Sequence, residues 1–359
     1  MNRIPVKLGI YSIKNFILPF AVMSLLSIFL YVLAEFFDKM NVFLNGNIPF
    51  ETILLYFLYF IPKMFFMMFP LSILFASVFV ISNMNHNNEL ISVYGAGIST
   101  LQFSIPLLVF IFIFTLFITL FQDYYVPNTY QKKIEIEQTM FNRKKVADNA
   151  KIFSKGSDNK FFFIDRYIDS ESKLTGIYII QFNSKNELIM EINAESAYYK
   201  KNKWVFQNVK QVNYYNNIPK ISYYGEKTYP FKETPVYFAR NVQDIDTLTI
   251  KSAYQYIFFL KKFDVSNFED ELKFWQKFSL PMGGFIIAIF GIVAGTYFRK
   301  NVLISSILLC LIIFGAYYWI MNSFWNFGRK GFTTAFMAAW IGDILFMGIG
   351  FISMIFLKN

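Results

Sequence analysis

The chain carries six long apolar stretches, and one polar block of about 150 residues separates the first three from the last three. The stretches cover residues 16–34, 52–81, 101–121, 278–297, 302–321 and 334–357. About 20 apolar residues in a helix are enough to cross the hydrocarbon core of a bilayer. This layout predicts an α-helical membrane bundle of six transmembrane helices, with a water-facing domain inserted between the third and the fourth.

The composition agrees with a membrane protein and places most charges in the polar block. Only 16% of the residues are charged, against about 25% in an average soluble domain. Of the 34 Lys and Arg residues, 24 lie between Asp123 and Lys277, together with 19 of the 24 acids. The basic residues form no stripe. The net charge of +10 therefore predicts attraction to anionic lipid headgroups, or reflects a biased composition, and does not predict nucleic-acid binding.

The basic residues of the short loops predict the orientation of the bundle. With the N-terminus inside the cell, six of them lie in inner segments and three in outer loops. Because inner loops are enriched in Lys and Arg, this count favours cytoplasmic N- and C-termini and a polar block outside the cytoplasm. The inner six are Arg3, Lys7, Lys14, Arg299, Lys300 and Lys358, and the outer three are Lys39, Arg329 and Lys330.

The second apolar stretch is too long for a simple span and contains two prolines. About 30 residues would make about 45 Å of helix, against about 30 Å of hydrocarbon. Pro62 and Pro70 interrupt the stretch, and Lys63 follows the first of them. Proline leaves carbonyl groups that lipid cannot satisfy. We interpret the stretch as a kinked helix beside an internal cavity; an interfacial turn before a shorter span is the alternative.

Sequence patterns divide the polar block into a helical part and a β part. Residues 130–146 are charged and helix-compatible, which predicts a stalk that continues from the third span past Pro127. From about residue 152 to 249, short aromatic and β-branched runs alternate with polar turns, a pattern typical of a sandwich, a jelly roll or an open barrel. Runs such as 178–180 and 204–206 are apolar on both faces, which indicates a groove or partner face, or a biased composition. We place the domains at 1–121, 122–270 and 271–359.

The sequence lacks the residue patterns of a catalytic site. No P-loop occurs, and the single histidine, His86, has no partner for a triad or a metal site. The single cysteine, Cys310, lies in an apolar stretch, which excludes a disulfide framework and a thiol metal cluster. Asp343 lies in the last span, where it is either functional or a hydrogen-bonding partner of a neighbouring helix. We therefore predict no catalytic residue, metal or cofactor, and expect a separate subunit to hydrolyse any ATP.

A short motif between the second and third spans predicts a docking helix. Residues 87–99 read Asn-Asn-Glu-Leu-Ile-Ser-Val-Tyr-Gly-Ala-Gly-Ile-Ser, an amphipathic pattern that glycines close. On the cytoplasmic side, a short helix within 84–98 is a place where another protein can dock. A re-entrant turn or an interfacial loop is the alternative.

This motif resembles the E-L-x-x-x-x-A-x-G-I-S signature of the lipopolysaccharide export permeases, the LptF/LptG family of ABC transporter subunits. Three further stretches resemble the same family in the same order: 192–209, Leu280-Pro281 and Ala338-Ala339-Trp340. The resemblance extends over nearly the whole chain. It implies a multi-pass protein of the bacterial inner membrane, with a periplasmic all-β jelly-roll domain inserted into the six-helix bundle.

The resemblance also implies partners and a substrate. A second LptF/LptG-type permease pairs with the chain, a dimeric cytoplasmic ABC ATPase docks on both, and a single-span jelly-roll protein of the LptC type joins them. The complex extracts lipopolysaccharide, or a related glycolipid, from the inner membrane and passes it along a periplasmic jelly-roll bridge toward the outer membrane. Pro62-Lys63 and Phe36-Phe37-Asp38 resemble the G type of the family, whereas Glu35 stands where that type often has a cation.

Three groups of site residues follow from the resemblance. The helix that couples to the ATPase contains Glu89, Leu90, Tyr94, Gly95 and Gly97. The expected contacts of lipid phosphates are Lys63, Lys39 and Lys14, and the expected residues of the jelly-roll groove are Ile179, Ile192, Tyr198, Trp204 and Phe206. Asn85 and His86 stand where an arginine is frequent, so the contacts with the ATPase are expected to differ in detail.

Two other classes of protein share part of this layout. A permease of another ABC lipid or lipoprotein export system usually has its external domain after the first of four spans, so the number of spans discriminates. A membrane-anchored sensor or scaffold with an extracytoplasmic β domain is the second alternative. A sensor would need a cytoplasmic signalling domain, which no cytoplasmic segment here is long enough to form.

Overall fold

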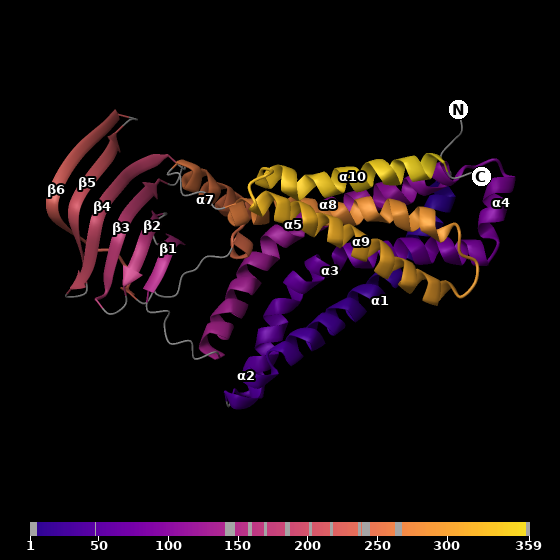
Figure 1. The fold of residues 1–359 in the computed structure, drawn as a ribbon, viewed down its shortest axis with the longest axis horizontal. Coiled ribbons are helices and arrows are strands. Elements are labelled where there is room, and N and C mark those ends of the chain that lie inside the picture. The colour runs from indigo at the N-terminus through magenta and orange to yellow at the C-terminus, as the bar shows by residue number, and fades with distance from the viewer. Residues whose placement is uncertain are drawn as a thin grey trace. The chain divides into compact units, whose positions relative to one another are not determined.

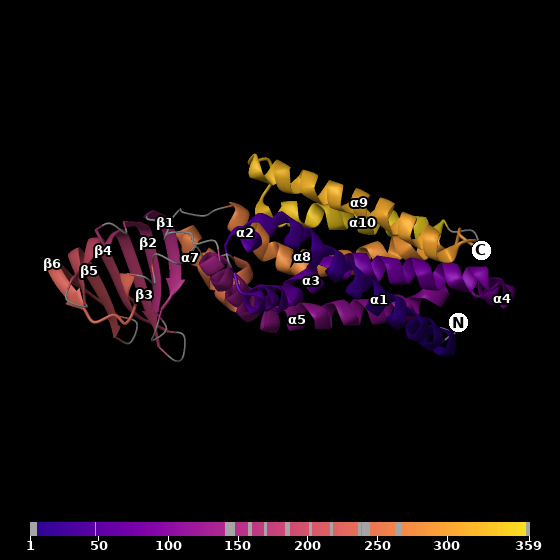
Figure 2. The ribbon, with the colours of Figure 1, turned by 90° about the horizontal axis from the view of Figure 1, so that it is seen from below.

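The computed structural model describes two compact units, one helical and one made of β-strands. The helical unit comprises Met1–Met140 together with Ile245–Asn359, and the β unit comprises Phe141–Asp244. Figures 1 and 2 show the long helices of the first unit and the curved sheet of the second. The structure describes residues 6–46, 48–140, 148–156, 160–168, 171–183, 187–200, 203–215, 218–235, 238, 245–262 and 268–356. The predicted fold class, a helical membrane bundle with an inserted β domain, is confirmed.

Six helices of the described residues are long and apolar enough to cross a membrane. They are α1 (Val6–Asp38), α3 (Phe50–His86), α5 (Thr100–Met140), α8 (Phe268–Gly295), α9 (Val302–Arg329) and α10 (Ala335–Ile355). Each coincides with one of the predicted spans, and most extend beyond it. The shorter elements are α2 (Met40–Asn45), α4 (Glu89–Gly95), η1 (Ile245–Thr247) and α7 (Ile250–Lys262). The segment predicted as domain 122–270 therefore contains the β unit together with the end of α5, η1, α7 and the first residues of α8.

Helix α3 lies at the centre of the helical unit. In its most apolar window 72% of the residues are buried, against 22% in α1 and 17% in α9. Helix α3 packs against α1, α5, α8 and α9. Its contact with α8 requires glycine at two positions, because a Cβ would lie 2.9 Å from the Cβ of Ser77 at Gly291 and 2.7 Å from that of Ile81 at Gly295. Small residues of this kind let membrane helices approach closely.

The long helices α3 and α5 continue through their prolines. Helix α3 has 37 residues and contains both Pro62 and Pro70, so the structure has no turn before a shorter second span. At about 1.5 Å per residue it is about 55 Å long, which exceeds the hydrocarbon core of about 30 Å. Helix α5 contains Pro127 and continues to Met140. The predicted stalk is therefore a direct extension of the third span.

Six antiparallel strands form the described part of the β unit and neighbour one another in the order of the sequence. They are β1 (Asp148–Lys155), β2 (Lys160–Ile168), β3 (Lys173–Phe182), β4 (Leu188–Lys200), β5 (Lys203–Tyr215) and β6 (Ile218–Tyr229). Strand β4 is continuous over its 13 residues, because its ladder with β3 continues through Ala194 and Ser196. Antiparallel neighbours of this kind need only short turns between them.

A crease crosses the sheet from β1 to β6. The ladder pairs Ile164 with Ile177 and Arg166 with Thr175 but skips the residues between them, 165 and 176. The same interruption recurs at 195, 208 and 225 in the next strands. The backbone has φ angles of 61° at Gly176 and 51° at position 208, an asparagine. Glycine and asparagine adopt such angles more readily than other residues.

The crease shifts the alternation of side chains by one residue within a strand. In β4, Ile192 and Ala194 lie in the apolar core before the crease, and Ala197 lies in it after the crease. In β5 the corresponding core residues are Phe206 and Val209. Side chains of a regular strand alternate with a period of two. A prediction from strict alternation is therefore wrong by one position beyond the crease.

The face of the sheet that carries this core, which we call the inner face, is covered by the segment that follows β6. Trp204 is 1% exposed, and its Nε1–H donates a 2.7 Å hydrogen bond to the backbone oxygen of Glu233. The rings of Phe231 and Phe238 lie 5.5 and 5.4 Å from that of Phe162. These contacts fill one part of the inner face with aromatic side chains of the same chain.

Candidate functional site

The two ends of the helical unit differ in chemistry. We call the end at which the chain leaves after Met140 and returns at Ile245 the insertion end, and the opposite end, which carries α4, the α4 end (Figure 1). Ion pairs between different helices gather at the insertion end. At the α4 end, polar contacts connect turns and a short helix.

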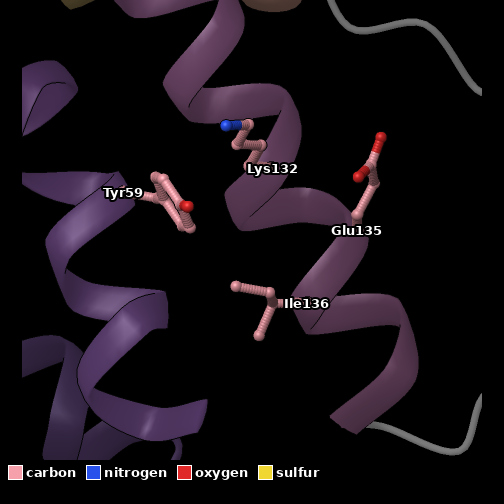
Figure 3. A pocket seen from close by; sticks show the side chains of 4 residues that line it. All are labelled: Tyr59, Lys132, Glu135 and Ile136. Carbon is pink, nitrogen blue, oxygen red and sulfur yellow. The ribbon is translucent and has the colours of Figure 1, made fainter. Parts of the chain in front are cut away.

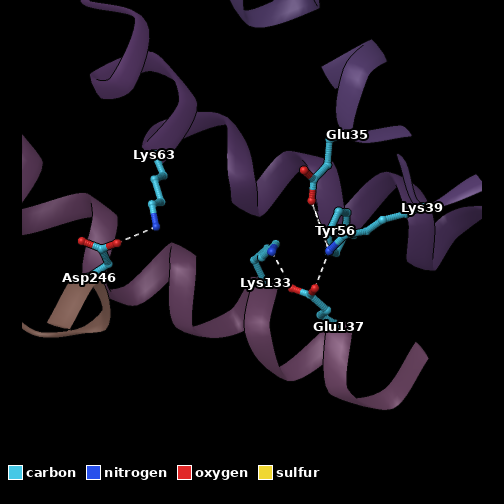
Figure 4. A network of polar contacts seen from close by, with 7 residues as sticks. All are labelled: Glu35, Lys39, Tyr56, Lys63, Lys133, Glu137 and Asp246. Carbon is cyan, nitrogen blue, oxygen red and sulfur yellow. Dashed lines mark hydrogen bonds and ion pairs between the residues drawn. The ribbon is translucent and has the colours of Figure 1, made fainter. Parts of the chain in front are cut away.

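Seven polar residues form a cluster at the insertion end, which we call the insertion-end cluster (Figure 4). They are Glu35, Lys39, Tyr56, Lys63, Lys133, Glu137 and Asp246. They come from the end of α1 and the residue after it, the first half of α3, the last part of α5 and η1. The ring of Tyr130 lies between its two groups, with its centroid 3.5 Å from Lys63 Nζ and 5.5 Å from Lys133 Nζ.

The first group consists of two lysines and two glutamates around Tyr56. Lys39 forms ion pairs with Glu35, at 3.2 Å, and with Glu137. Lys133 pairs with Glu137 at 2.5 Å, and the Tyr56 hydroxyl donates to Glu35 at 2.7 Å. Tyr56 and Lys133 are buried. The charge of Lys133 and the charges next to it therefore each require an opposite charge to offset the loss of hydration. Burial opposes the charged form of Lys39, but Glu137 and Glu35 together raise its pKa above the ordinary value.

The second group consists of Lys63 and Asp246. Lys63 Nζ lies 2.6 Å from Asp246 Oδ2, and the exposed fractions of the two side chains are 16% and 28%. The same Nζ lies over the ring of Tyr130, which adds a cation–π interaction. Lys63 follows Pro62 in the first half of α3, where the helix is still at the insertion end. The pair is partly accessible to solvent, unlike Lys133 in the first group.

A hollow of about 360 Å³ lies next to the cluster, between α3 and α5 (Figure 3). Its lining comprises Tyr59 of α3 and Lys132, Glu135 and Ile136 of α5. Lys132 Nζ lies 5.2 Å from the centroid of the Tyr59 ring. The hollow combines a ring and an aliphatic side chain with one cation and one carboxylate, which is a surface suited to an amphiphilic ligand.

The three lysines predicted to contact lipid phosphates do not lie together. Lys63 and Lys39 both belong to the insertion-end cluster. Lys14 is exposed near the start of α1, whereas Lys39 directly follows the end of that helix. At about 1.5 Å per residue, the two are about 37 Å apart along the helix. A single headgroup therefore cannot contact Lys14 and Lys39 at once.

The sequence interpretation missed the contributions of α5 and η1 to this site. The sequence pattern places Lys132, Lys133 and Glu137 only in a charged stalk, and it does not distinguish Asp246 from the other acids of the polar block. Their spacing carries a signal, since Lys133 and Glu137 lie four residues apart on a helix and so share one face. For Asp246, in a 3-10 turn after the β unit, the local sequence offers no comparable signal.

At the α4 end, the predicted docking helix forms, but over fewer residues than 84–98. Helix α4 has seven residues, and Leu90 and Val93 are buried in the core of the helical unit. Ile91, between them, is 47% exposed. Leu90 therefore fixes the helix to the bundle, and the residues available to a partner lie on the other side, around Ile91.

The remaining predicted coupling residues have different roles in the local structure. The carboxylate of Glu89 accepts a 3.0 Å hydrogen bond from the hydroxyl of Tyr11 in α1. The hydroxyl of Tyr94 lies 3.1 Å from that of Thr100, at the start of α5. Gly95 and Gly97 are exposed, and the φ angle of +74° at Gly97 favours glycine for the turn after the helix.

The turn between α8 and α9 is hydrogen-bonded to the last residues of α3, which precede α4. The buried side chain of Asn85 donates a 2.6 Å hydrogen bond to the backbone oxygen of Thr296 and accepts a 3.0 Å one from Arg299 Nε. His86 Nδ1 lies 2.6 Å from the backbone oxygen of Arg299, which assigns the proton to Nδ1. The turn between α8 and α9 thus forms a single polar unit with the end of α3. Tyr297, in this turn, is 70% exposed.

Four of the five predicted groove residues lie in the core of the β unit. Ile179, Ile192, Trp204 and Phe206 are buried at the inner face. Tyr198 does not belong to this cluster, and its hydroxyl donates a hydrogen bond to Gln207. The crease explains the difference, because it moves the inward position from 198 to 199, and Tyr199 packs against the core.

Comparison with known proteins matches nearly the whole chain. A family model described as lipopolysaccharide export system permease LptF/LptG matches residues 10–356. The lipopolysaccharide export system permease protein LptG of Haemophilus influenzae is 25% identical over 231 residues, which are 62% of this chain and 62% of that protein. The alignment thus spans less than two thirds of this relative. The family match covers all six spans, α4 and the β unit.

Proposed function

Because this chain belongs to the LptF/LptG family of lipopolysaccharide export permeases, we propose that it is one permease of an ABC transporter that extracts lipopolysaccharide, or a related glycolipid, from the inner membrane. The complex passes the lipid to a periplasmic jelly-roll bridge toward the outer membrane. The family match over residues 10–356 is the observation that carries this proposal. The β unit is then periplasmic, and both termini are cytoplasmic. The likeness to LptG from Haemophilus influenzae supports the G type.

In this function the insertion end receives the phosphorylated headgroup. Two cations at this end carry the proposal: Lys63, whose Nζ lies over the ring of Tyr130, and Lys132, which lines the open hollow together with Tyr59 and the carboxylate of Glu135. A cation near low-dielectric surroundings attracts phosphate more strongly than it does in bulk water. Lys39 is engaged by Glu35 and Glu137, so its role is to hold the surrounding helices together. Lys14, at the other end of α1, takes no part in this site.

The acyl chains follow the inner face of the β unit. Transfer of apolar surface to water costs about 0.8 kcal/mol per CH₂, so several acyl chains would cost tens of kcal/mol without an apolar path. Ile179, Ile192 and Phe206 form such a surface. Phe231 and Phe238 cover part of it, so passage requires these two rings to move.

The α4 end receives the cytoplasmic ATPase. Helix α4 presents Ile91 and the glycines that follow, while Leu90 and Val93 hold it in the bundle. A force on α4 therefore reaches the core around α3 and α5 directly. A second permease of the same family completes the bundle against the exposed apolar faces of the helical unit, and a single-span protein with its own jelly roll extends the path.

Reconstitution tests the proposal. The chain is co-expressed with a second permease of the family and with the ATPase, and the purified complex is placed in liposomes that contain lipopolysaccharide. We expect the three proteins to co-purify and ATP to drive lipopolysaccharide onto a soluble jelly-roll acceptor. The control is a complex whose ATPase variant cannot hydrolyse ATP. If the native complex hydrolyses ATP but transfers no more lipopolysaccharide than this control, the proposal is contradicted.

A further inference from the structure

The chain that returns from the β unit is attached to three spans by polar contacts. We call residues Ile245–Ile250 the return segment. Its Asp246 pairs with Lys63 of α3 at 2.6 Å, and the backbone N–H of Ile250 donates to Asp123 Oδ1 of α5 at 2.5 Å. Lys277 of α8 donates to the backbone oxygen of Leu248 at 2.7 Å.

These three attachments differ in how easily a ligand can replace them. The contacts of Ile250 and Leu248 use backbone groups, and Lys277 is buried at 6% exposure. The contact of Asp246 is an ion pair between two partly exposed side chains. Its carboxylate is an oxyanion that supplies to Lys63 the same kind of acceptor as a phosphate oxygen does. An anionic ligand that reaches Lys63 therefore competes with Asp246 and with neither of the other two attachments.

We propose that Asp246 occupies Lys63 in place of a lipid-borne phosphate, and that binding of the phosphate releases the return segment from α3. The proposal rests on the function proposed above and adds to it a positioning residue and a response. The backbone contacts with α5 and α8 hold the segment in register while its contact with α3 opens. Because the segment begins the connection that runs from the β unit through α7 to α8, headgroup binding is transmitted to that connection.

The competition also limits the affinity of the site. Lys63 exchanges one oxyanion for another when the phosphate binds, so only the difference between the two interactions favours the lipid. Removing the carboxylate of Asp246 removes the competitor. A purely structural role of the ion pair predicts the opposite, since the same substitution would then disturb α3 and weaken binding.

The test compares Asp246→Asn with the native chain in the assembled complex, in nanodiscs. A photoreactive benzoylphenylalanine replaces Tyr59, one turn before Lys63, and the half-saturation concentration for crosslinking of labelled diphosphoryl lipid A is measured. We expect Asp246→Asn to lower this concentration about fivefold, as the loss of a partly exposed ion pair would allow. Dephosphorylated lipid A should show no gain. Asp38→Asn, an exposed acid near the end of α1, makes the same change in charge and should have no effect.

A second measurement follows the segment itself. The chain has one cysteine, Cys310, so a Cys310→Ala background accepts a single nitroxide label at Thr247→Cys. We expect diphosphoryl lipid A to increase the mobility of this label, and Asp246→Glu, which keeps the charge, to retain the response. Inorganic phosphate at the same concentration should not produce it, because the proposed ligand is phosphate carried by lipid.

The outcomes separate the two proposals. An unchanged or higher half-saturation concentration in Asp246→Asn, or a label that does not respond to diphosphoryl lipid A, overturns the competition while lipid transport by the complex still stands. An equal response to inorganic phosphate overturns the assignment to lipid. A complex that neither crosslinks lipid A nor transports lipopolysaccharide overturns the proposed function and this inference together.

Discussion

The hydroxyl of Tyr317 donates a 2.8 Å hydrogen bond to Oδ1 of Asp343, and each of these residues is 1% exposed. The bond joins α9 to α10 inside the helical unit. Gly283 of α8 lies against it, because a Cβ there would be 1.9 Å from the Tyr317 hydroxyl oxygen. Of the two roles considered for Asp343 from the sequence, the structure contains the hydrogen bond between neighbouring helices.

Replacing Tyr317 with Phe should loosen the contact between α9 and α10. The substitution removes the one hydrogen bond described for Asp343 and keeps the ring, so we expect the free energy of unfolding in mixed micelles to fall by about 0.5–2 kcal/mol. Tyr318→Phe is the matched control, since Tyr318 is 45% exposed on the same helix. Equal losses for the two variants would show that the bond to Asp343 has no specific role.

Neighbouring residues of α4 should separate anchoring from docking. Leu90→Ala removes a buried side chain, and we expect the chain to lose about 2–5 kcal/mol of stability. Ile91→Ala should change stability by no more than about 0.5 kcal/mol but weaken binding of the ATPase about fivefold or more, as expected for a central apolar contact. Thermal unfolding and titration of the purified ATPase measure the two effects. If Ile91→Ala binds the ATPase with native affinity, the exposed side of α4 is not the docking surface.

Lys63 and Lys14 should differ in their effect on the binding of phosphorylated lipid. Lys63→Gln removes the cation at the insertion end, and we expect crosslinking of diphosphoryl lipid A from position 59 to require about tenfold more lipid, because a charge-assisted hydrogen bond is lost. Lys14→Gln changes the same charge at the other end of α1 and should leave the crosslinking unchanged. A similar effect of both variants would indicate that the overall charge of the protein, and not a binding site at Lys63, governs lipid binding.

The cover of the inner face should control access to the β unit. Phe238→Leu shortens a side chain that packs on Phe162 and Trp204 and keeps the site apolar. We expect crosslinking of acyl chains from a photoreactive residue at Ile179 to increase in the resting complex. Tyr223→Leu is the control, because Tyr223 is 73% exposed on β6. No increase with Phe238→Leu would mean that the acyl chains enter without passing this ring.

The extent to which the sequence predicted the site can be judged from particular residues. The motif around Glu89 correctly placed a short helix between the second and third spans, because glycines and a local apolar pattern mark such a helix. The same motif did not separate Leu90, which is buried, from Ile91, which is exposed. That distinction depends on how the helix lies on α1, α3 and α5. The family resemblance likewise pointed to Tyr198, whereas the inner face has Tyr199, since the crease arises from backbone angles that span several strands.

The sequence by itself determined the spans, the inserted β unit and the polar turns between strands, because a bilayer and a sheet each impose a period and a length on contiguous residues. Only the tertiary structure decided which charges meet. Lys63 and Asp246 are 183 positions apart, and Lys39 and Glu137 are 98 apart. No local pattern encodes such pairs, since their partners are set by how α1, α3, α5 and the return segment pack together at one end of the bundle.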